Sequence, residues 1–289
     1  MCRLFGFRSV ISSQVHSSLL EADNALLHQS LKHPDGWGVG YYLGGVPHVI
    51  KSTETAVSDS LFRQVGGLVA SKTVLAHLRK ATLGQVSIVN THPFQHGRWI
   101  FAHNGNIKNF STHRQQLLTE VDPVLSRYIL GDSDSELLFY CLLTEIRKLT
   151  SIYEDVPVKV VGKAVKSLIR RLEIIIGPHM RKVCKPTETY LTFILTNGTT
   201  MLAFHGGQDL YFSTYKTQCP ESEDCRYYGA SCESEDPDGS INHLVISSEV
   251  LTGTNIFLPL TPGEMVGADH HMIIYRDKID VSEHRSDVG

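Results

Sequence analysis

The chain has 289 residues, of which 42% are hydrophobic and 20% are charged, a composition typical of a globular protein that can bury a large core. A formal net charge of −3 provides no basic surface for nucleic acid, and no basic run is typical of a membrane-surface segment. No stretch has the length and apolarity of a signal peptide or a membrane span, so we expect a cytoplasmic protein without nucleic-acid or membrane partners.

In the first part of the chain, strand patterns alternate with helix patterns. Leu4–Val10 is predicted to be a strand, and Ser18 with Glu21 predicts a capping box at the start of a leucine-rich helix that reaches Leu31. The next predicted elements are a hairpin of Val39–Tyr42 and His48–Lys51 about Gly44-Gly45, a helix from about Asp59 to Val69, and strands at Thr73–Leu78 and Arg98–His103.

The second part of the chain carries longer helix patterns, followed by strands. The predicted elements are helices near Thr112–Val121, at Ser133–Leu149 and at Val158–Ile176, a hairpin of Tyr190–Leu195 and Thr200–Phe204 about Asn197-Gly198, and strands at His243–Ser247 and Met272–Tyr275. Antiparallel hairpins with helices in separate runs favour an α+β protein, with a pair of sheets covered by helices, over a doubly wound parallel sheet.

The chain contains six cysteines, too few for a disulfide scaffold at this length, and reduced thiols fit the expected compartment. Cys219, Cys225 and Cys232 cluster, but their spacing is not that of a zinc site. They lie in a polar, acidic stretch, so we expect an inserted surface loop over about residues 216–240.

Cys2 directly follows the initiator methionine. Removal of Met1 would leave this residue with both a thiol, whose ordinary pKa is about 8.5, and a free α-amine, whose pKa is about 7.7–8.0. The amine could then take the thiol proton through a water molecule, which would make Cys2 both nucleophile and base. The alternative is that Cys2 simply begins an N-terminal strand with Leu4 and Phe5.

Two motifs, the first at the end of a predicted strand, carry side chains suited to binding. Arg79, in His77-Leu78-Arg79-Lys80-Ala81-Thr82-Leu83-Gly84, could hold a small carboxylate with two parallel hydrogen bonds, and the alternative is a surface salt bridge. The second motif is Asn90-Thr91-His92-Pro93-Phe94, for which the alternative is a loop shaped by proline with a hydrogen-bonded histidine.

Two further motifs carry polar groups at the ends of predicted elements. His103-Asn104-Gly105-Asn106 could be a turn, but the Asn104 amide beside the Gly105 backbone N–H also offers the two donors of an oxyanion hole. In Ser133-Asp134-Ser135-Glu136 we expect a capping box in which Glu136 reaches back to Ser133. Asp134 would then lie in the first helical turn, where it could accept a hydrogen bond from a substrate ammonium.

Together and in this order, the motifs resemble those of the class II glutamine amidotransferases, which are N-terminal nucleophile hydrolases. The resemblance spans about the first 150 residues and is nearest to the stand-alone group that includes enzymes cleaving γ-glutamyl amides. It rests on Cys2, Asp35-Gly36-Trp37-Gly38, His77-x-Arg79-x-Ala81-Thr82-x-Gly84, Asn90-x-His92-Pro93, His103-Asn104-Gly105 and Asp134-Ser135-Glu136. It implies a single domain over residues 1–289, folded as a four-layer αββα sandwich of two mostly antiparallel sheets.

The resemblance also implies roles for individual residues. Cys2 would attack the γ-amide of glutamine or of a γ-glutamyl compound, with Asn104 and Gly105 as the oxyanion hole, and water would hydrolyse the γ-glutamyl thioester to glutamate. The residues expected to bind the substrate are Arg79 on the α-carboxylate, Asp134 on the α-amine, and Thr82 and His92. No metal or cofactor enters this cycle, and any synthase activity would need a partner chain. The sequence departs from many members at Lys32-His33, where they carry Arg-Gly.

Two other functions remain open from sequence alone. A non-catalytic glutamine-binding subunit of a synthase would keep Arg79 and Asp134, and retention of Met1 would favour it. A conventional cysteine hydrolase would pair Cys141 or Cys184 with a histidine. His270 and His271 are expected to be ordinary strand residues without a carboxylate partner for a metal site.

Overall fold

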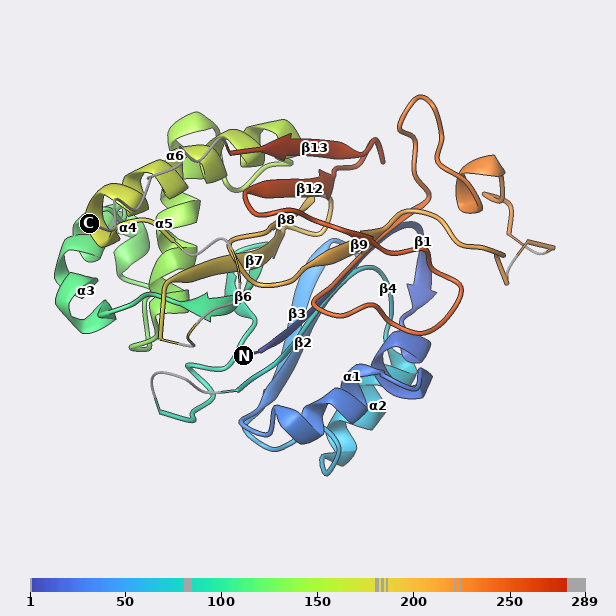
Figure 1. The fold of residues 1–289 in the computed structure, drawn as a ribbon, viewed down its shortest axis with the longest axis horizontal. Helices are drawn as coiled ribbons and strands as arrows, with labels where there is room; N and C mark the ends of the chain where they lie inside the picture. Colours follow the sequence, from blue (N-terminus) through green and yellow to red (C-terminus); the bar gives the residue numbers. More distant parts are fainter. Residues whose placement is uncertain are drawn as a thin grey trace, which may run out of the picture.

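Two antiparallel sheets are stacked face to face, and helices cover their outer faces (Figure 1). The computed structural model describes residues 2–80, 85–179, 182, 185, 187–220, 222–223 and 225–279. Every strand pair in both sheets of this described part is antiparallel. The predicted α+β class and the αββα layering are therefore confirmed.

The first sheet has seven strands in the order β11-β9-β10-β1-β4-β2-β3. Their bounds are β1 (Arg3–Gln14), β2 (Trp37–Leu43), β3 (Val46–Ser52), β4 (Ala70–Leu78), β9 (Tyr211–Ser213), β10 (His243–Ser247) and β11 (Leu258–Pro259). Strand β1 lies in the middle of this sheet, between β10 and β4, with Leu4 opposite His77. Cys2 therefore immediately precedes a central strand.

The second sheet has six strands in the order β13-β12-β8-β7-β6-β5. Their bounds are β5 (Phe94–His96), β6 (Trp99–Asn106), β7 (Tyr190–Thr196), β8 (Met201–Phe204), β12 (Glu264–Ala268) and β13 (Tyr275–Lys278). The predicted strand at Met272–Tyr275 was wrong, because Met272 has a positive φ of 53° in the turn between β12 and β13. Strand β12, which pairs with β8, was not predicted.

Helices pack against the outer face of each sheet. Their bounds are α1 (Leu26–Gln29), α2 (Ser60–Leu68), α3 (Phe110–Thr119), α4 (Pro123–Ser126), α5 (Asp134–Leu149) and α6 (Val158–Ile176), with short turns at η1 (Ser17–Glu21), η2 (Ser30–Lys32) and η3 (Ala230–Cys232). The predicted helices over 59–69, 112–121, 133–149 and 158–176 are confirmed as α2, α3, α5 and α6. Helices α5 and α6 share one buried cluster with the second sheet, whereas α1 and α2 share another with the first.

A third apolar cluster fills the space between the two sheets, with Leu4 and Leu75 from the first sheet and Ile100 and Ile194 from the second. The sheets approach closely at Gly6, where an added Cβ would lie 3.2 Å from side-chain atoms of Ile194 and Met201. Such tight packing fixes β1 against the second sheet and so fixes where the chain before β1 can lie.

The leucine-rich helix predicted after β1 was wrong, because this segment forms two short turns and α1 instead. Glu21 pairs with His16, at 2.8 Å, and does not form a capping box with Ser18. Between η1 and α1, the Asn24 side chain donates to Val250 O at 2.6 Å and accepts from Thr252 N at 2.9 Å. These tertiary hydrogen bonds hold the chain in a non-helical path, which outweighs the local helix preference.

The segment between β9 and β10 carries the inserted stretch expected at 216–240. In its described residues η3 is the one helical turn, and Figure 1 shows the orange segment extending beyond the sheets. The side chains of Cys219 and Cys232 are nevertheless buried. Among the described residues, no helix combines the length and apolarity that crossing a bilayer requires.

Candidate active site

The Cys2 thiol lies against the backbone of Lys80. The Lys80 N–H donates to Cys2 Sγ at 3.3 Å, and the thiol lies 3.5 Å from Lys80 O. Burial raises the pKa of the Cys2 thiol, the Lys80 N–H and the Arg79 charge lower it, and the Asp134 charge raises it. The thiol therefore lies within the electrostatic reach of both residues that the sequence assigned to the two ends of glutamine.

Arg79 is buried at the end of β4, and its backbone is held from both sides. The Arg79 N–H donates to Gly36 O at 2.8 Å, and Asp35 N–H donates to Arg79 O at 3.1 Å. Gly36 has a φ of +117°, a conformation that favours glycine. Both Nη atoms of Arg79 donate to Gln85 O at 3.2 Å, and Asn90 Nδ2 also reaches that oxygen, at 3.3 Å. Asp35 and Gly36 thus fix the backbone of Arg79, and Gln85 O, which Asn90 also contacts, fixes its guanidinium.

Asp134 lies in the first turn of α5, where the unpaired N–H groups of a helix favour negative charge. Its Oδ2 accepts from Ile107 N at 2.7 Å and its Oδ1 accepts from Ser135 Oγ at 3.2 Å. The helix is capped by Ser133 Oγ, which accepts from Ser135 N at 3.1 Å. The carboxylate is buried, and its position is set by the Ile107 backbone N–H and the Ser135 hydroxyl.

The predicted capping box at this helix is only half present. Glu136 does not reach back to Ser133, because its carboxylate accepts from Leu130 N at 3.0 Å and from Gly131 N at 2.7 Å. The expectation for Glu136 was wrong, and its actual role is to shape the loop that enters α5.

His103 connects Asp134 to the second sheet through Ser135. The ring nitrogens of His103 lie 2.9 Å from Ser135 Oγ at Nδ1 and 2.9 Å from Tyr190 O at Nε2. Because a carbonyl only accepts, Nε2 carries the proton, and the Ser135 hydroxyl, which has a single proton, lies between His103 Nδ1 and Asp134 Oδ1. Burial lowers the pKa of His103, whereas the Asp134 charge raises it.

Asn104 and Gly105 follow His103 on β6. The buried Asn104 side chain makes no hydrogen bond with any other residue that the structure describes, so its amide is available to a substrate. A Cβ at Gly105 would lie 2.1 Å from Tyr190 O and 2.5 Å from His103 Nε2, which excludes any side chain there. Asn104 and Arg3, the residue after Cys2, line one cavity of about 280 Å³.

His77 and His92 lie inside the protein beside these residues. Their ring centroids are 4.2 Å apart, and within the described ranges neither ring has a hydrogen-bond partner at either nitrogen. Burial and the Arg79 charge lower the pKa of His77 to about 3, and burial with the neighbouring cations lowers the pKa of His92 well below its usual value. His92 is covered by Phe94 as well, and a Cβ at Gly38 would lie 2.1 Å from His92 O. Thr82 lies outside the described residues.

Residues 1–270 match the family described as glutamine amidotransferases class-II. The chain belongs to the class II glutamine amidotransferases. Among curated relatives, a Methanocaldococcus jannaschii protein without an assigned function is 34% identical over 51% of this chain and 39% of its own length. The γ-glutamyl-hercynylcysteine sulfoxide hydrolase of Mycobacterium tuberculosis is 34% identical over 36% of this chain and 49% of its own length. The matches thus span about half the length of these relatives or less.

Solved structures of class II amidotransferase proteins have the same fold. A glutamine aminotransferase class-II domain protein from Silicibacter pomeroyi superimposes with a TM-score of 0.60 at 20% identity, covering 96% of this chain and 99% of that one. The glutamine phosphoribosylpyrophosphate amidotransferase of B. subtilis gives a TM-score of 0.58 at 17% identity, covering 96% of this chain and 49% of that one. At these identities the likeness establishes the fold alone.

Three residues of this class II amidotransferase site were not found from the sequence: Ser135, Tyr190 and Gln85. Ser135 was seen only as part of a helix cap, although its hydroxyl bridges Asp134 and His103. Tyr190 and Gln85 contribute backbone carbonyls, for which a sequence has no signal. His33, which with Lys32 replaces the Arg-Gly that many members of the family carry, is buried, and its Nδ1 lies 2.7 Å from Gln29 O.

The other candidate nucleophile in the described residues is unsuited to catalysis. Cys141 is buried in α5 with its Sγ 3.8 Å from Leu117 O, and burial raises the pKa of its thiol to about 12. A thiol with such a high pKa is almost entirely protonated at neutral pH and is a poor nucleophile. Cys184 lies outside the described residues.

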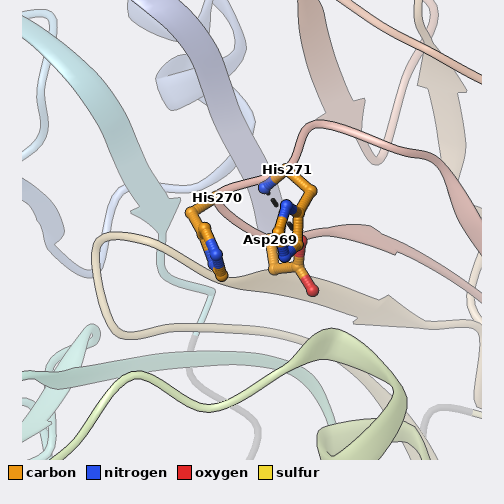
Figure 2. A group of neighbouring side chains, drawn as sticks. All are labelled: Asp269, His270 and His271. Carbon is orange, nitrogen blue, oxygen red and sulfur yellow. Dashed lines mark hydrogen bonds between the residues drawn. The ribbon is translucent and has the colours of Figure 1, made fainter.

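His270 and His271 do have a carboxylate neighbour, contrary to expectation. Figure 2 shows both imidazoles beside Asp269, and ligand atoms of the three residues lie within 4.8 Å of one another. Both Asp269 oxygens already accept backbone hydrogen bonds, from His271 N at 3.0 Å and from Val158 N at 3.2 Å. Asp269 therefore caps the start of α6 and orders the turn before β13.

Proposed function

We propose that this chain hydrolyses the γ-amide bond of glutamine or of a γ-glutamyl compound, with Cys2 as the nucleophile after removal of Met1. The observation that carries the proposal is the setting of the Cys2 thiol. The thiol sulfur accepts a hydrogen bond from the Lys80 backbone N–H, and the charges of Arg79 and Asp134 both shift its pKa. The γ-glutamyl part of the substrate is a zwitterion, so its recognition needs one fixed cation and one fixed anion near the nucleophile.

Arg79 holds the α-carboxylate in this proposal. Its planar guanidinium fork suits a carboxylate, and its two Nη atoms are positioned by Gln85 O. Asp134 accepts from the α-ammonium, because each of its oxygens accepts one hydrogen bond in the structure and has a further lone pair. Thr82 and His92 complete the binding site, with His92 supporting it from the protein interior.

The reaction proceeds in two stages. The α-amine of Cys2 takes the thiol proton through a water molecule, and the sulfur attacks the amide carbon. The Asn104 amide and the Gly105 backbone N–H stabilise the oxyanion. The C–N bond then breaks as the α-ammonium of Cys2 returns the proton to the leaving amine. Water, activated by the same α-amine, hydrolyses the γ-glutamyl thioester to glutamate and regenerates the thiol.

Glutamate release from glutamine and from γ-glutamyl amides tests this function. Protein whose intact mass begins at Cys2 should release glutamate, and Cys2→Ala should abolish release while glutamine still binds in a calorimeter. Cys225→Ala, in the loop between β9 and β10, is the matched cysteine control and should keep wild-type activity. Binding of glutamine without glutamate release by mass-verified wild-type protein would contradict the proposal and favour a non-catalytic binding subunit.

A further inference from the structure

The cavity of about 280 Å³ that opens beside Asn104 has no role in holding the γ-glutamyl group. Arg3, Asn104, Gln208, Asp209, Ser248 and Glu249 line it, whereas Arg79 and Asp134 do not. One water molecule in the liquid takes up about 30 Å³, and ammonia is of similar size. The cavity is therefore much larger than the release of ammonia requires, and its contact with Asn104 places it next to the reacting amide.

Two buried amide side chains in the cavity wall lack partners. Gln208 Nε2 and Asn104 Oδ1 are both excluded from solvent without a hydrogen bond to any described residue. The backbone of Gln208 is fixed by Thr192, whose Oγ1 accepts from Gln208 N at 2.9 Å and donates to Gln208 O at 3.2 Å. A buried polar atom without a partner is costly, so Gln208 Nε2 leaves an unfilled donor and Asn104 Oδ1 an unfilled acceptor in side chains of the cavity wall.

The charges of the wall are unbalanced. Arg3 forms an ion pair with Glu249, and its Nη1 also lies 3.4 Å from Cys2 O. Asp209 is exposed at the rim and forms no hydrogen bond or ion pair with the residues described. The wall is tied to β1, because Leu4 N donates to Ser248 Oγ at 2.9 Å. The lining thus contains one carboxylate, Asp209, that has no ion-pair partner among the described residues.

We infer that this cavity is the leaving-group subsite and that it selects γ-glutamyl amides whose amine part carries a second, positively charged nitrogen. The inference rests on the proposed function. The scissile amide lies at Asn104, the amine part extends past Gln208, and its distal cation faces Asp209. When the C–N bond breaks, the leaving nitrogen takes the proton that came from the Cys2 thiol, and a diamine departs in place of ammonia.

A matched pair of substrates tests the charge selection. γ-Glutamyl-1,4-diaminobutane carries a distal ammonium, and γ-glutamyl-butylamide has the same chain length without it. Wild-type kcat/KM should favour the cationic substrate by about 1.5-fold to fivefold, the usual range for one exposed charge pair, and the preference should shrink as salt is raised. Asp209→Asn should bring the ratio of the two kcat/KM values close to one. Asp23→Asn, at an exposed position outside the cavity, should keep the wild-type ratio.

The outcomes separate this inference from the proposed function. Hydrolysis of glutamine and of both amides with equal kcat/KM would overturn the subsite assignment and leave the hydrolase intact. A preference that persists in Asp209→Asn would overturn it as well, as would hydrolysis of glutamine but of neither larger amide. Absence of glutamate release from every substrate by mass-verified protein would instead remove the proposed function, and the subsite with it.

Discussion

Single residues at this site are held mainly by backbone atoms. Arg79 is fixed through the carbonyls of Gly36 and Gln85, and Asp134 is fixed through the Ile107 N–H. Backbone groups of this kind position a charged side chain without neutralising it with a full opposite charge. The site therefore holds one cation and one anion through backbone groups, which suits the two ends of the proposed zwitterionic substrate.

Replacement of Arg79 by lysine tests the carboxylate assignment. Lysine keeps the charge but loses the planar fork, so KM for a γ-glutamyl substrate should rise more than kcat falls. Steady-state kinetics on glutamine would measure both. Arg63→Lys, on the exposed face of α2, is the control and should change neither constant. An unchanged KM in Arg79→Lys would remove Arg79 from this role.

Asn104→Ala tests the oxyanion hole. Deletion of one such donor costs about 10²–10³ in kcat, and little stability should be lost because Asn104 makes no hydrogen bond to another described residue. Asn106→Ala, two residues along the same strand, should lower the stability of the fold and leave kcat nearly unchanged. Asn106 Nδ2 donates to Glu188 O at 2.8 Å, so its loss should cost about 1 kcal/mol of unfolding free energy with little change in kcat. Activity within a few-fold of wild type in Asn104→Ala would leave Asn104 and Gly105 without a catalytic role.

The candidate site could be predicted from the sequence only through the combination of its motifs, because each motif alone has another use, such as a turn or a helix cap. The reasons for the spacing of these residues could not be predicted from the sequence. That Asp35 and Gly36 hold Arg79 follows from strand register, and that Ser135 joins Asp134 to His103 follows from the packing of α5 on β6. His92 illustrates the limit, because its motif predicted a binding residue without revealing that both ring nitrogens are buried.

At the scale of elements, the approach of β6 to β7 sets the geometry of the proposed oxyanion hole. Gly105 lies opposite Leu191 in this pair, and its missing side chain lets Tyr190 O reach His103. The strand pair thus orients His103 and presents Asn104 from the same short segment. Local sequence showed Asn-Gly as a turn signal, but the glycine is needed here for close approach within a strand.

Gly105→Ala should therefore destabilise the fold. The added Cβ would meet backbone oxygen at 2.1 Å, which cannot move aside as a flexible side chain would, and we expect a loss of at least about 2–3 kcal/mol in the free energy of unfolding. Gly67→Ala is the control, because a Cβ there has nothing within 4 Å and lies within α2, where alanine should add about 0.5–1 kcal/mol. Urea denaturation of both variants would measure the effect, and equal stabilities would refute the close contact.

The buried histidine pair joins β4 to the loop before β5 and makes stability depend on pH. The pKa of His77 is about 3 in the folded protein against an ordinary 6.5, so the unfolded chain binds this proton first as pH falls. The contribution of neutral His77 to the free energy of unfolding is complete above pH 6.5. It is lost as pH falls from there towards 3, by about 1.4 kcal/mol per pH unit for each such histidine. The lowered pKa of His92 adds to the loss in the same direction.

Urea denaturation between about pH 7 and pH 5 would measure this dependence. His77→Leu should reduce the slope of unfolding free energy against pH by about one proton. His28→Gln, at an exposed position in α1, should leave the slope as in wild type. If His77→Leu leaves the slope of unfolding free energy against pH unchanged, the His77 ring does not cause the pH dependence of stability.

Elements with strong local signals were predicted well, and those set by tertiary contacts were not. Helices α5 and α6 carry clear apolar periodicity, and the β2–β3 hairpin has two glycines with positive φ at its turn. The predicted helix after β1 failed because the Asn24 side chain bonds residues more than two hundred positions away. Strand β12 was missed because Gly267 interrupts its pattern, although an added Cβ there would lie 2.5 Å from Met201 O.

Over the whole molecule, the layered fold brings together residues from every part of the first half of the chain. Cys2 immediately precedes a central strand of the first sheet, Asn104 and Gly105 lie on the second sheet, and Asp134 begins a helix outside that sheet. The stacking of β1 on the second sheet fixes where the proposed nucleophile lies relative to the proposed oxyanion donors. The α+β class followed from the order of predicted elements, but this meeting of two sheets depends on packing between distant strands.

The central claim is that Cys2 acts as nucleophile with its own α-amine as the base. The most direct test compares kcat for protein whose intact mass begins at Cys2 with kcat for the same chain carrying an uncleavable N-terminal extension. The account predicts that the extended protein is slower by about 10²–10⁴, because an acylated nitrogen cannot accept the thiol proton even though the sulfur is intact. Equal values of kcat would contradict it, because a histidine base would not be affected by the extension.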